Sequence, residues 1–280
     1  MPYGTWIIRE IESPKGYVLS EEEIAVTIGK VDEVVEIELV NYFIKGNIAL
    51  TKVDEDYPDN KLSGAVFEVY SDTNGDGKLD KDDTLLGEMK ELDGGVYQMS
   101  ELRYGKYLVK ETKAPTGFVL DEDVYAVSIE ENGKTYTVEN KAGVGFINAA
   151  QKGSLKIVKT SSDGKVEGFS FRVTGVDYDQ TFKTDKNGEI VIEGLRIGDY
   201  TVSEVSDKAS AGYILPADKQ ATVKVDATAI VQMHNEFRDT PKTGDDFNLG
   251  LWVSLAALSV VGAGVLGFVG YKNRKKKKED

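Results

Sequence analysis

The sequence predicts a mainly β chain, built from tandem antiparallel β-sandwiches and followed by one C-terminal membrane-spanning helix. Three observations predict this fold class. Before residue 245, short runs of alternating apolar and polar residues are broken by Gly, Asn and Asp, and helical periodicity is nearly absent. Similar blocks recur, and they delimit units of about 90–100 residues, a usual size for a sandwich. One uncharged apolar run then extends from about Phe247 to Tyr271.

Three recurring blocks define the repeated units. The first block contains a Gly, an aromatic residue and a Glu, at residues 3–10, 104–111 and 198–204. The second places a Lys six residues after a Gly, at residues 46–52 and 153–159. The third ends in Asn41, Asn148 or Asn235. These blocks predict units at residues 1–43, 44–149 and 150–238. The first unit lacks the Lys-bearing block, so we expect it to be the truncated C-terminal part of a sandwich.

Strand alternation places a charged or amide residue on the apolar face of three strands in each full unit. In the second unit these residues are Lys52, Glu111 and Asn148. In the third unit they are Lys159, Glu204 and Asn235. An isolated buried Lys or Glu costs several kcal/mol, roughly, even after relaxation. We therefore expect the three side chains of each set to meet. The alternative is that they lie at the rim, with each Lys reaching water.

The Glu blocks resemble the YxLxExxAPxGY box of the Cna B-type domains of Gram-positive surface proteins and pilins. Residues 107–118 match the box closely, and the first unit matches it with Ser13 in place of Ala. In the third unit an insertion separates Glu204 from Gly212. The resemblance implies an immunoglobulin-like, prealbumin-like sandwich. It also implies an amide bond between the Lys and Asn side chains of each set, promoted by the Glu.

Burial is consistent with that chemistry. Desolvation lowers the pKa of a Lys and raises the pKa of a Glu, so both neutral forms become accessible. A neutral Lys can attack an amide carbon, and a neutral Glu can donate a hydrogen bond to the Asn carbonyl and shuttle protons. No bond is expected in the first unit, where Glu10 and Asn41 have no partner Lys in this chain. We expect a longer parent chain to supply that Lys upstream.

Residues 72–83 match the twelve-residue loop that binds Ca²⁺ in many proteins. Oxygen ligands are expected from side chains at loop positions 1, 3, 5, 9 and 12 and from the backbone carbonyl at position 7: Asp72, Asn74, Asp76, Asp80, Asp83 and Lys78. The flanking residues read as strands rather than helices. The alternative is an acidic turn that holds no metal.

Residues 239–280 predict a sorting signal. The segment contains the pentapeptide Thr-Pro-Lys-Thr-Gly, an apolar run long enough to cross a bilayer as a helix, and a basic tail. This order resembles the LPxTG signal of Gram-positive wall-anchored proteins, with Thr240 in the usual place of Leu. The resemblance implies that a sortase cuts between Thr243 and Gly244 and joins the chain to peptidoglycan or to a pilus subunit. The preceding units would then be extracellular, with the helix only a transient membrane anchor.

Composition narrows the function. A formal net charge of -14 disfavours nucleic acid as a partner. The chain has no Cys and one His, His234, which we expect to be exposed, and it shows no motif of an enzyme acting on external substrates. We predict a non-enzymatic structural stalk of a surface protein. The alternative is a minor pilin subunit or an adhesin for a host matrix protein, with its recognition domain upstream.

Overall fold

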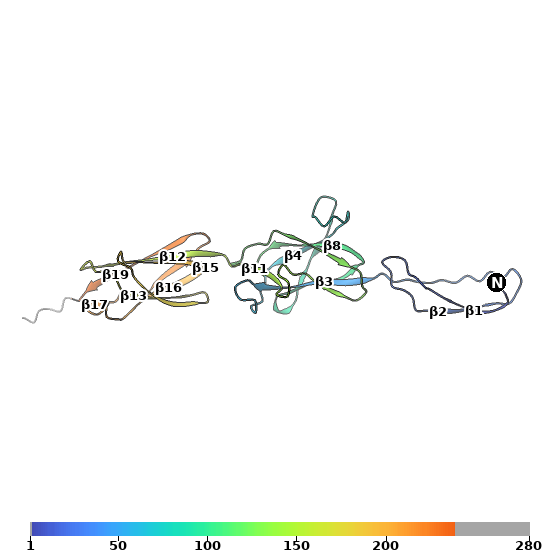
Figure 1. Cartoon of the computed structure of the whole chain (residues 1–280), viewed down its shortest axis with the longest axis horizontal. Helices are drawn as coiled ribbons and strands as arrows, with labels where there is room; N and C mark the ends of the chain where they lie inside the picture. Colours follow the sequence, from blue (N-terminus) through green and yellow to red (C-terminus); the bar gives the residue numbers. More distant parts are fainter. Residues whose placement is uncertain (1, 239–280) are drawn as a thin grey trace, which may run out of the picture.

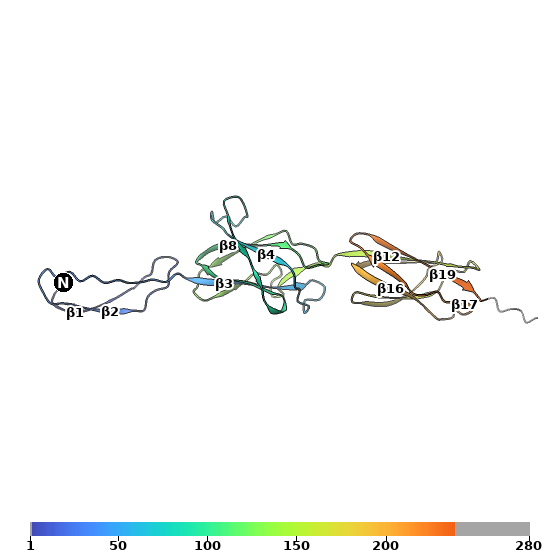
Figure 2. The ribbon, with the colours of Figure 1, turned by 180° about the vertical axis from the view of Figure 1, so that it is seen from behind.

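The computed structural model describes residues 2–238, and the predicted sorting segment, including Thr243 and Gly244, lies outside the described residues. The predicted units follow one another in a row along the long axis of the molecule (Figures 1 and 2). The described part of the chain consists of strands, turns and one short 3₁₀ turn, Asp93–Gly95. None of its helices is long and apolar enough to span a bilayer. The prediction of a mainly β chain is confirmed for this part.

The second unit is a sandwich of two sheets. Its first sheet has the strand order β10 (Thr135–Thr137), β3 (Lys45–Asp54), β7 (Val96–Arg103) and β6 (Lys90–Glu91), and β11 (Phe146–Asn148) also pairs with β3. Its second sheet has the order β5 (Thr84–Glu88), β4 (Val66–Ser71), β8 (Gly105–Lys113) and β9 (Val124–Ile129). Between the sheets lies a core that includes Ile48, Leu50, Phe67, Val109 and Phe146.

The third unit repeats this arrangement. One sheet has the order β15 (Glu189–Arg196), β12 (Lys152–Ser161), β19 (Thr228–Phe237) and β17 (Tyr213–Ile214). The other has the order β14 (Tyr178–Lys183), β13 (Ser170–Gly175), β16 (Gly198–Val205) and β18 (Lys219–Val223). The core contains Leu155, Ile157, Phe171, Val202 and Met233. Alternation along β12 buries every second side chain from Gly153 to Lys159, so the Lys continues the apolar face.

The sequence predicted antiparallel sandwiches, but the sheets of both full units also contain parallel strand pairs. In the second unit the first strand, β3, runs parallel to β10 and to the last strand, β11. In the third unit β12 runs parallel to β19 over eight residue pairs, from Ser154↔Thr228 to Ser161↔Asn235. A parallel pair needs a long crossover connection, and here the rest of each unit provides it. The first and last strands of each unit therefore lie side by side and run in the same direction.

The Gly that precedes each Lys by six residues is required by close backbone contact. A Cβ on Gly46 would lie 2.8 Å from the carbonyl oxygen of Lys134, and a Cβ on Gly153 would lie 2.2 Å from that of Lys224. The strand pairing also shifts register directly after each Gly. Only a residue without a side chain fits there, which accounts for the recurrence of this block.

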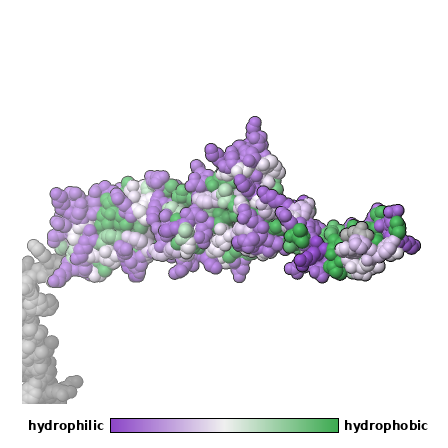
Figure 3. Space-filling model, turned by 45° about the vertical axis from the view of Figure 1, so that its right-hand side comes forward, coloured by the Kyte–Doolittle hydropathy of each residue, from purple (hydrophilic) through white to green (hydrophobic). Residues whose placement is uncertain are grey.

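The first unit contributes one two-stranded antiparallel sheet, β1 (Gly4–Arg9) and β2 (Glu23–Ile28). Many of its apolar side chains are exposed, among them Ile7, Ile11, Val34 and Tyr42. Figure 3 shows hydrophobic surface on this unit, whereas hydrophilic surface predominates on the other two. The described residues of this unit thus bury far less apolar surface than those of the full sandwiches.

Candidate functional site

The second unit brings its three predicted site residues together in the core. Lys52 comes from β3, Glu111 from β8 and Asn148 from β11, so both sheets contribute. Lys52 and Glu111 are each 0% exposed and Asn148 is 3% exposed. The alternative that they lie at a wet rim is wrong for these side chains. Because β3 and β11 are neighbours, the Lys-bearing strand runs directly beside the Asn-bearing strand.

Hydrogen bonds orient the side chains of this triad. Lys52 Nζ donates to the carbonyl oxygen of Phe146, at 2.9 Å, which directs the amine toward the last strand. Asn148 Nδ2 donates to both carboxyl oxygens of Glu111, at 3.0 and 2.9 Å. Asn148 Oδ1 is buried and has no partner within the described residues. Glu111 therefore contacts the amide nitrogen, whereas the sequence analysis expected it to donate to the carbonyl oxygen. A half-turn of the amide group would exchange the two atoms.

Burial shifts the pKa values of this triad toward the neutral forms. Desolvation lowers the pKa of Lys52 to about 8, although the charge of Glu111 opposes this shift. Desolvation raises the pKa of Glu111, against hydrogen bonds from the Asp121 amide and from Asn148. A neutral amine is thus accessible close to physiological pH, and it lies in the same buried site as a carboxyl group whose pKa is raised by desolvation.

The third unit assembles the corresponding triad with a different Lys contact. Asn235 Nδ2 donates to Glu204 Oε1 at 2.6 Å, and desolvation raises the pKa of Glu204. Lys159 is 1% exposed, and its Nζ donates to the carbonyl oxygen of Thr160 at 2.5 Å and lies 4.2 Å from the ring centroid of Phe169. Desolvation lowers its pKa as well. Glu204 Oε2 and Asn235 Oδ1 are buried without partners in the described chain.

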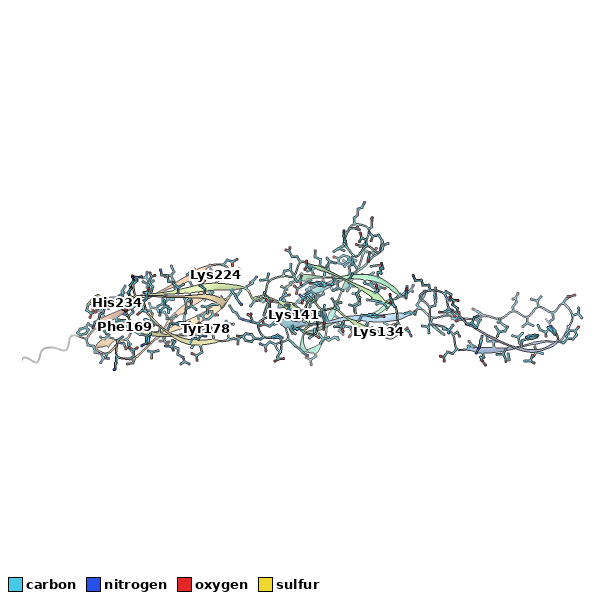
Figure 4. All side chains as sticks on the ribbon, viewed as in Figure 1. Lys134, Lys141, Phe169, Tyr178, Lys224 and His234 are labelled. Carbon is cyan, nitrogen blue, oxygen red and sulfur yellow. The ribbon has the colours of Figure 1, made fainter. Side chains whose placement is uncertain are left out.

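Figure 4 helps to locate the triad of the third unit. Phe169 and His234 are labelled toward the end of that unit that faces away from the second unit. His234 is exposed, as expected, and one ring nitrogen pairs with the Thr160 hydroxyl at 2.8 Å. The adjacent Asn235 points the opposite way and is fully buried. Strand alternation thus separates a surface His from a buried Asn.

The first unit retains only the Glu–Asn pair. Asn41 Nδ2 donates to Glu10 Oε1 at 2.6 Å, and the Ser20 amide donates to Glu10 Oε2 at 2.8 Å. In the described part of the chain, no lysine hydrogen-bonds to either side chain. The hydrogen bond from Asn41 lowers the pKa of Glu10, the direction opposite to that of Glu111 and Glu204. An accessible carboxyl group stays ionised, so this pair lacks the environment of the two full triads.

Asp121 is a further member of the site in the second unit, and it was not among the residues predicted from the sequence. Its backbone amide donates to Glu111 Oε2 at 2.9 Å, and its carboxylate accepts hydrogen bonds from Tyr125 at 2.8 Å and from Asn140 at 2.7 Å. The spacing was a usable signal, since Ser20 follows Glu10 by ten residues just as Asp121 follows Glu111. Almost any residue type can donate a backbone amide, so residue type alone does not reveal this contact.

The calcium-type loop projects from the second unit between β4 and β5 (Figure 1). Its carboxylates accept hydrogen bonds from the loop's own backbone: Asp72 from Gly75 and Gly77, Asp76 from Lys78, Asp80 from Asp82, and Asp83 from Thr73 and Asp80. Asn74 Oδ1 accepts from the Asp76 amide in the same way. Within residues 2–238, no three His, Cys, Asp or Glu side chains are grouped closely enough to hold a metal ion. Calcium at this loop stays a prediction.

Comparisons with known proteins identify the repeated unit. The family model described as "SpaA: Prealbumin-like fold domain" matches residues 1–42, 46–142 and 153–237. The solved structure of the Bacillus anthracis TIE protein matches with a TM-score of 0.65 and 27% sequence identity, covering 85% of this chain and 42% of that chain. The chain thus spans less than half the length of that relative.

Two pilin structures also match. A streptococcal ancillary pilin has a TM-score of 0.31 and 18% identity, covering 85% of this chain and 76% of that chain. The shaft pilin SpaA of Lactobacillus rhamnosus GG has a TM-score of 0.32 and 14% identity, covering 69% of this chain and 98% of that chain. No curated protein sequence matches the chain.

Proposed function

The chain belongs to the family of SpaA-type prealbumin-like fold domains, and from this premise we propose that it is a structural stalk of a Gram-positive surface protein, stiffened by intramolecular Lys–Asn amide bonds. The observation that carries this proposal is the buried Lys–Glu–Asn triad, present in two consecutive sandwiches. A buried amine and a buried carboxyl group cost free energy in a passive scaffold. An amide bond removes the Lys charge, and with it most of that cost.

The bond forms between Lys52 Nζ and Asn148 Cγ. The neutral amine attacks the amide carbon, the bond from Cγ to Nδ2 breaks, and ammonia leaves. Glu111 lies against the leaving nitrogen and can carry the proton lost by Nζ to it. Because both strands hold the reacting groups in one site, the step is effectively unimolecular. Lys159, Glu204 and Asn235 take the same roles in the third unit.

Such bonds would change how the stalk carries a pulling force. Each would join the first strand of a unit to its last strand, which already lie side by side. Tension entering through β3 would pass from residue 52 to residue 148 through covalent bonds. Residues 53–147, which form most of the unit, would be shielded from the load. The same holds for residues 160–234, so neither sandwich could be extended between its cross-linked residues.

Intact-mass spectrometry tests the cross-links. We expect the chain to weigh less than its sequence by one ammonia for each bond, two in all. Lys52→Ala should retain one of these ammonia molecules. A matched control is Lys45→Ala, on the same strand but exposed and paired with Glu101, which should leave both losses unchanged. An unmodified mass for the intact chain would overturn the proposal.

We also propose that the chain is anchored to the cell wall through its C-terminal segment. The support is the order of pentapeptide, apolar run and basic tail in the sequence. A sortase would join Thr243 to an amine of peptidoglycan or of a pilus subunit. Expression in a sortase-bearing Gram-positive host tests this. We expect the wild-type chain in the covalently bound wall fraction, and Thr243→Ala in the membrane or medium. Equal wall attachment of both chains would contradict the assignment.

A further inference from the structure

A short turn with the pattern Leu-Arg-x-Gly-x-Tyr occurs once in each full sandwich, at residues 102–107 and 195–200. Its Leu and Tyr are buried in the core of their own unit. The Tyr107 hydroxyl donates to the carbonyl oxygen of Arg103 at 2.6 Å, and the Tyr200 hydroxyl donates to that of Arg196 at 2.8 Å. The backbone of each Arg is therefore fixed by its own unit, and both Arg side chains extend onto the preceding unit.

At the junction between the second and third units, Arg196 binds two carboxylates of the second unit. Its guanidinium donates to both oxygens of Asp54, at 2.6 and 2.8 Å, and to Asp56 at 3.0 Å. The Arg196 side chain is 15% exposed and that of Asp54 only 2%. The guanidinium also lies 4.9 Å from the ring centroid of Tyr57 and 5.9 Å from that of Phe118. This is a planar, bidentate and largely desolvated ion pair, the geometry that favours Arg over Lys.

The junction between the first and second units uses the equivalent residue. The guanidinium carbon of Arg103 lies 4.0 Å from the ring centroid of Phe43. The next residue, Tyr104, donates its backbone amide to the carbonyl oxygen of Ile44 at 2.9 Å. The neighbouring Ile197 likewise donates to Gln151 at 3.1 Å in the other junction. The two junctions thus share the Arg, and in each the residue after the Arg is hydrogen-bonded to the segment that begins its own unit; the junctions differ in the carboxylates.

The receiving surface is the same corner of the preceding unit in both cases. Isolated bridges pair Tyr17 with Phe43 at the end of the first unit, and Phe118 of the second unit with Ala150, the first residue of the third. In the third unit the residue equivalent to Asp56 is Asp163, four residues after the cross-linking Lys. Asp163 instead accepts hydrogen bonds from Tyr213 at 2.6 Å and Ser161 at 2.8 Å within its own unit. Asp163 is thus engaged within its own unit, whereas Asp56 binds the Arg of the following unit.

We infer that the Arg of this turn is an inter-unit latch, which fixes each sandwich onto an aromatic corner of the unit before it and, at the Arg196 junction, onto two carboxylates as well. Units connected by a short segment alone are expected to move relative to one another. A desolvated bidentate pair at a fixed backbone position removes that freedom at the Arg196 junction. The cross-links would make each sandwich inextensible, and the latch would keep successive sandwiches in a fixed orientation. Neither Arg contacts a triad side chain, so the latch and the cross-links can be tested with separate substitutions.

Distances between spin labels in the second and third units test the latch. The chain has no native Cys, so Glu122→Cys and Lys224→Cys, at exposed sites, give one label in each unit. With Arg196 present we expect a single narrow distance distribution. Arg196→Ala should broaden it roughly twofold, as for domains without a strong interface. Arg196→Lys should give an intermediate width, because Lys cannot form the bidentate pair.

The matched control is Arg172→Ala, which removes a bidentate pair with Asp179 that is exposed and lies within the third unit. It should leave the distribution narrow. Intact mass and circular dichroism of each variant show whether the third unit still folds and still loses ammonia. A narrow, unshifted distribution in folded Arg196→Ala would overturn the latch. That result would leave the cross-link proposal untouched, and a missing ammonia loss would not affect the latch.

Discussion

Replacing Glu111 by Gln distinguishes a Lys52 that is cross-linked to Asn148 from a buried Lys52 that keeps its free amine. In the wild type, the proposed amide leaves no titrating amine at Lys52. In Glu111→Gln, the group that would carry the proton is lost, so Lys52 should remain a free amine inside the core. Its folded pKa lies at about 8 with Glu111 present, against 10.5 for an unperturbed Lys. Loss of the carboxylate removes the largest interaction that raised this pKa, so it falls further.

The sign of the pH effect follows from these pKa values. Because the folded pKa lies below the unfolded one, the unfolded state binds more protons between about pH 8 and about pH 10.5, so the free energy of unfolding rises with pH there. One pKa unit corresponds to about 1.4 kcal/mol. Between about pH 7 and about pH 9.5, the second unit of the variant should therefore gain at least about 2 kcal/mol relative to the wild type. For a unit of this size, that is a relative rise in melting temperature on the order of 10 °C.

Scanning calorimetry at the two pH values measures this difference. Tyrosine ionisation also affects stability in this range, but it acts on both proteins alike and cancels in the comparison. Lys52→Met in the Glu111→Gln background is the control, and it should abolish the extra pH dependence. Identical pH dependence of Glu111→Gln and the wild type would show that no buried free amine titrates at Lys52 in the variant. So would an ammonia loss in the second unit of the variant, since the bond would then form without Glu111.

Four further predictions address the packing, the third triad, an acidic contact and the metal loop. Phe67→Ala removes a fully buried ring packed edge-on against Tyr97 and Phe146, and it should destabilise the second unit by about 3–5 kcal/mol in urea unfolding; an unchanged midpoint would contradict the described core. Gly188 has φ 78°, and an added Cβ would lie 2.7 Å from the carbonyl oxygen of Lys159. Gly188→Ala should therefore lower the melting temperature of the third unit, and mass spectrometry should show that part of the sample has lost one ammonia fewer. Hydrogen bonds from Tyr213 and Ser161 lower the pKa of Asp163 to about 2. The stabilisation from these bonds is therefore fully present above pH 3.8, the ordinary pKa of Asp, and it is lost as the pH falls toward about 2. Tyr213→Phe should make the melting temperature depend less on pH in this range, and the same pH dependence in both proteins would contradict the assignment. Added Ca²⁺ should raise the melting temperature of the wild-type second unit but not that of Asp76→Ala, and an equal response would exclude the loop as the binding site.

The burial of the two triads could be predicted because strand periodicity is a local property. Leu50 and Lys52 share a face whatever the rest of the fold does, and repetition of the pattern at Leu155 and Lys159 makes chance unlikely as an explanation. The recurring Gly before each Lys was visible in the same way. Its cause, the close approach of the Lys134 and Lys224 carbonyl oxygens, was not, because those residues are distant in sequence.

Strand direction and inter-unit contacts could not be predicted by the same means. Alternating apolar and polar residues occur in parallel and antiparallel strands alike, so the prediction of antiparallel sandwiches did not include the parallel pairing of the first and last strands. Asp121 reaches Glu111 through a backbone amide, and Arg196 reaches Asp54 across 142 positions of the chain. Neither contact follows from residue spacing.

Residue order alone predicts that this chain is a series of β units, and which Lys, Glu and Asn lie on apolar faces, because side-chain period and turn residues act over a few positions. The folded chain was needed to show that the first and last strands lie in parallel beside each other, that Asn148 presents its amide nitrogen to Glu111, and that Arg196 joins two units. Those outcomes depend on which distant segments pack together, and the free energy of that packing is shared among residues that no local pattern connects.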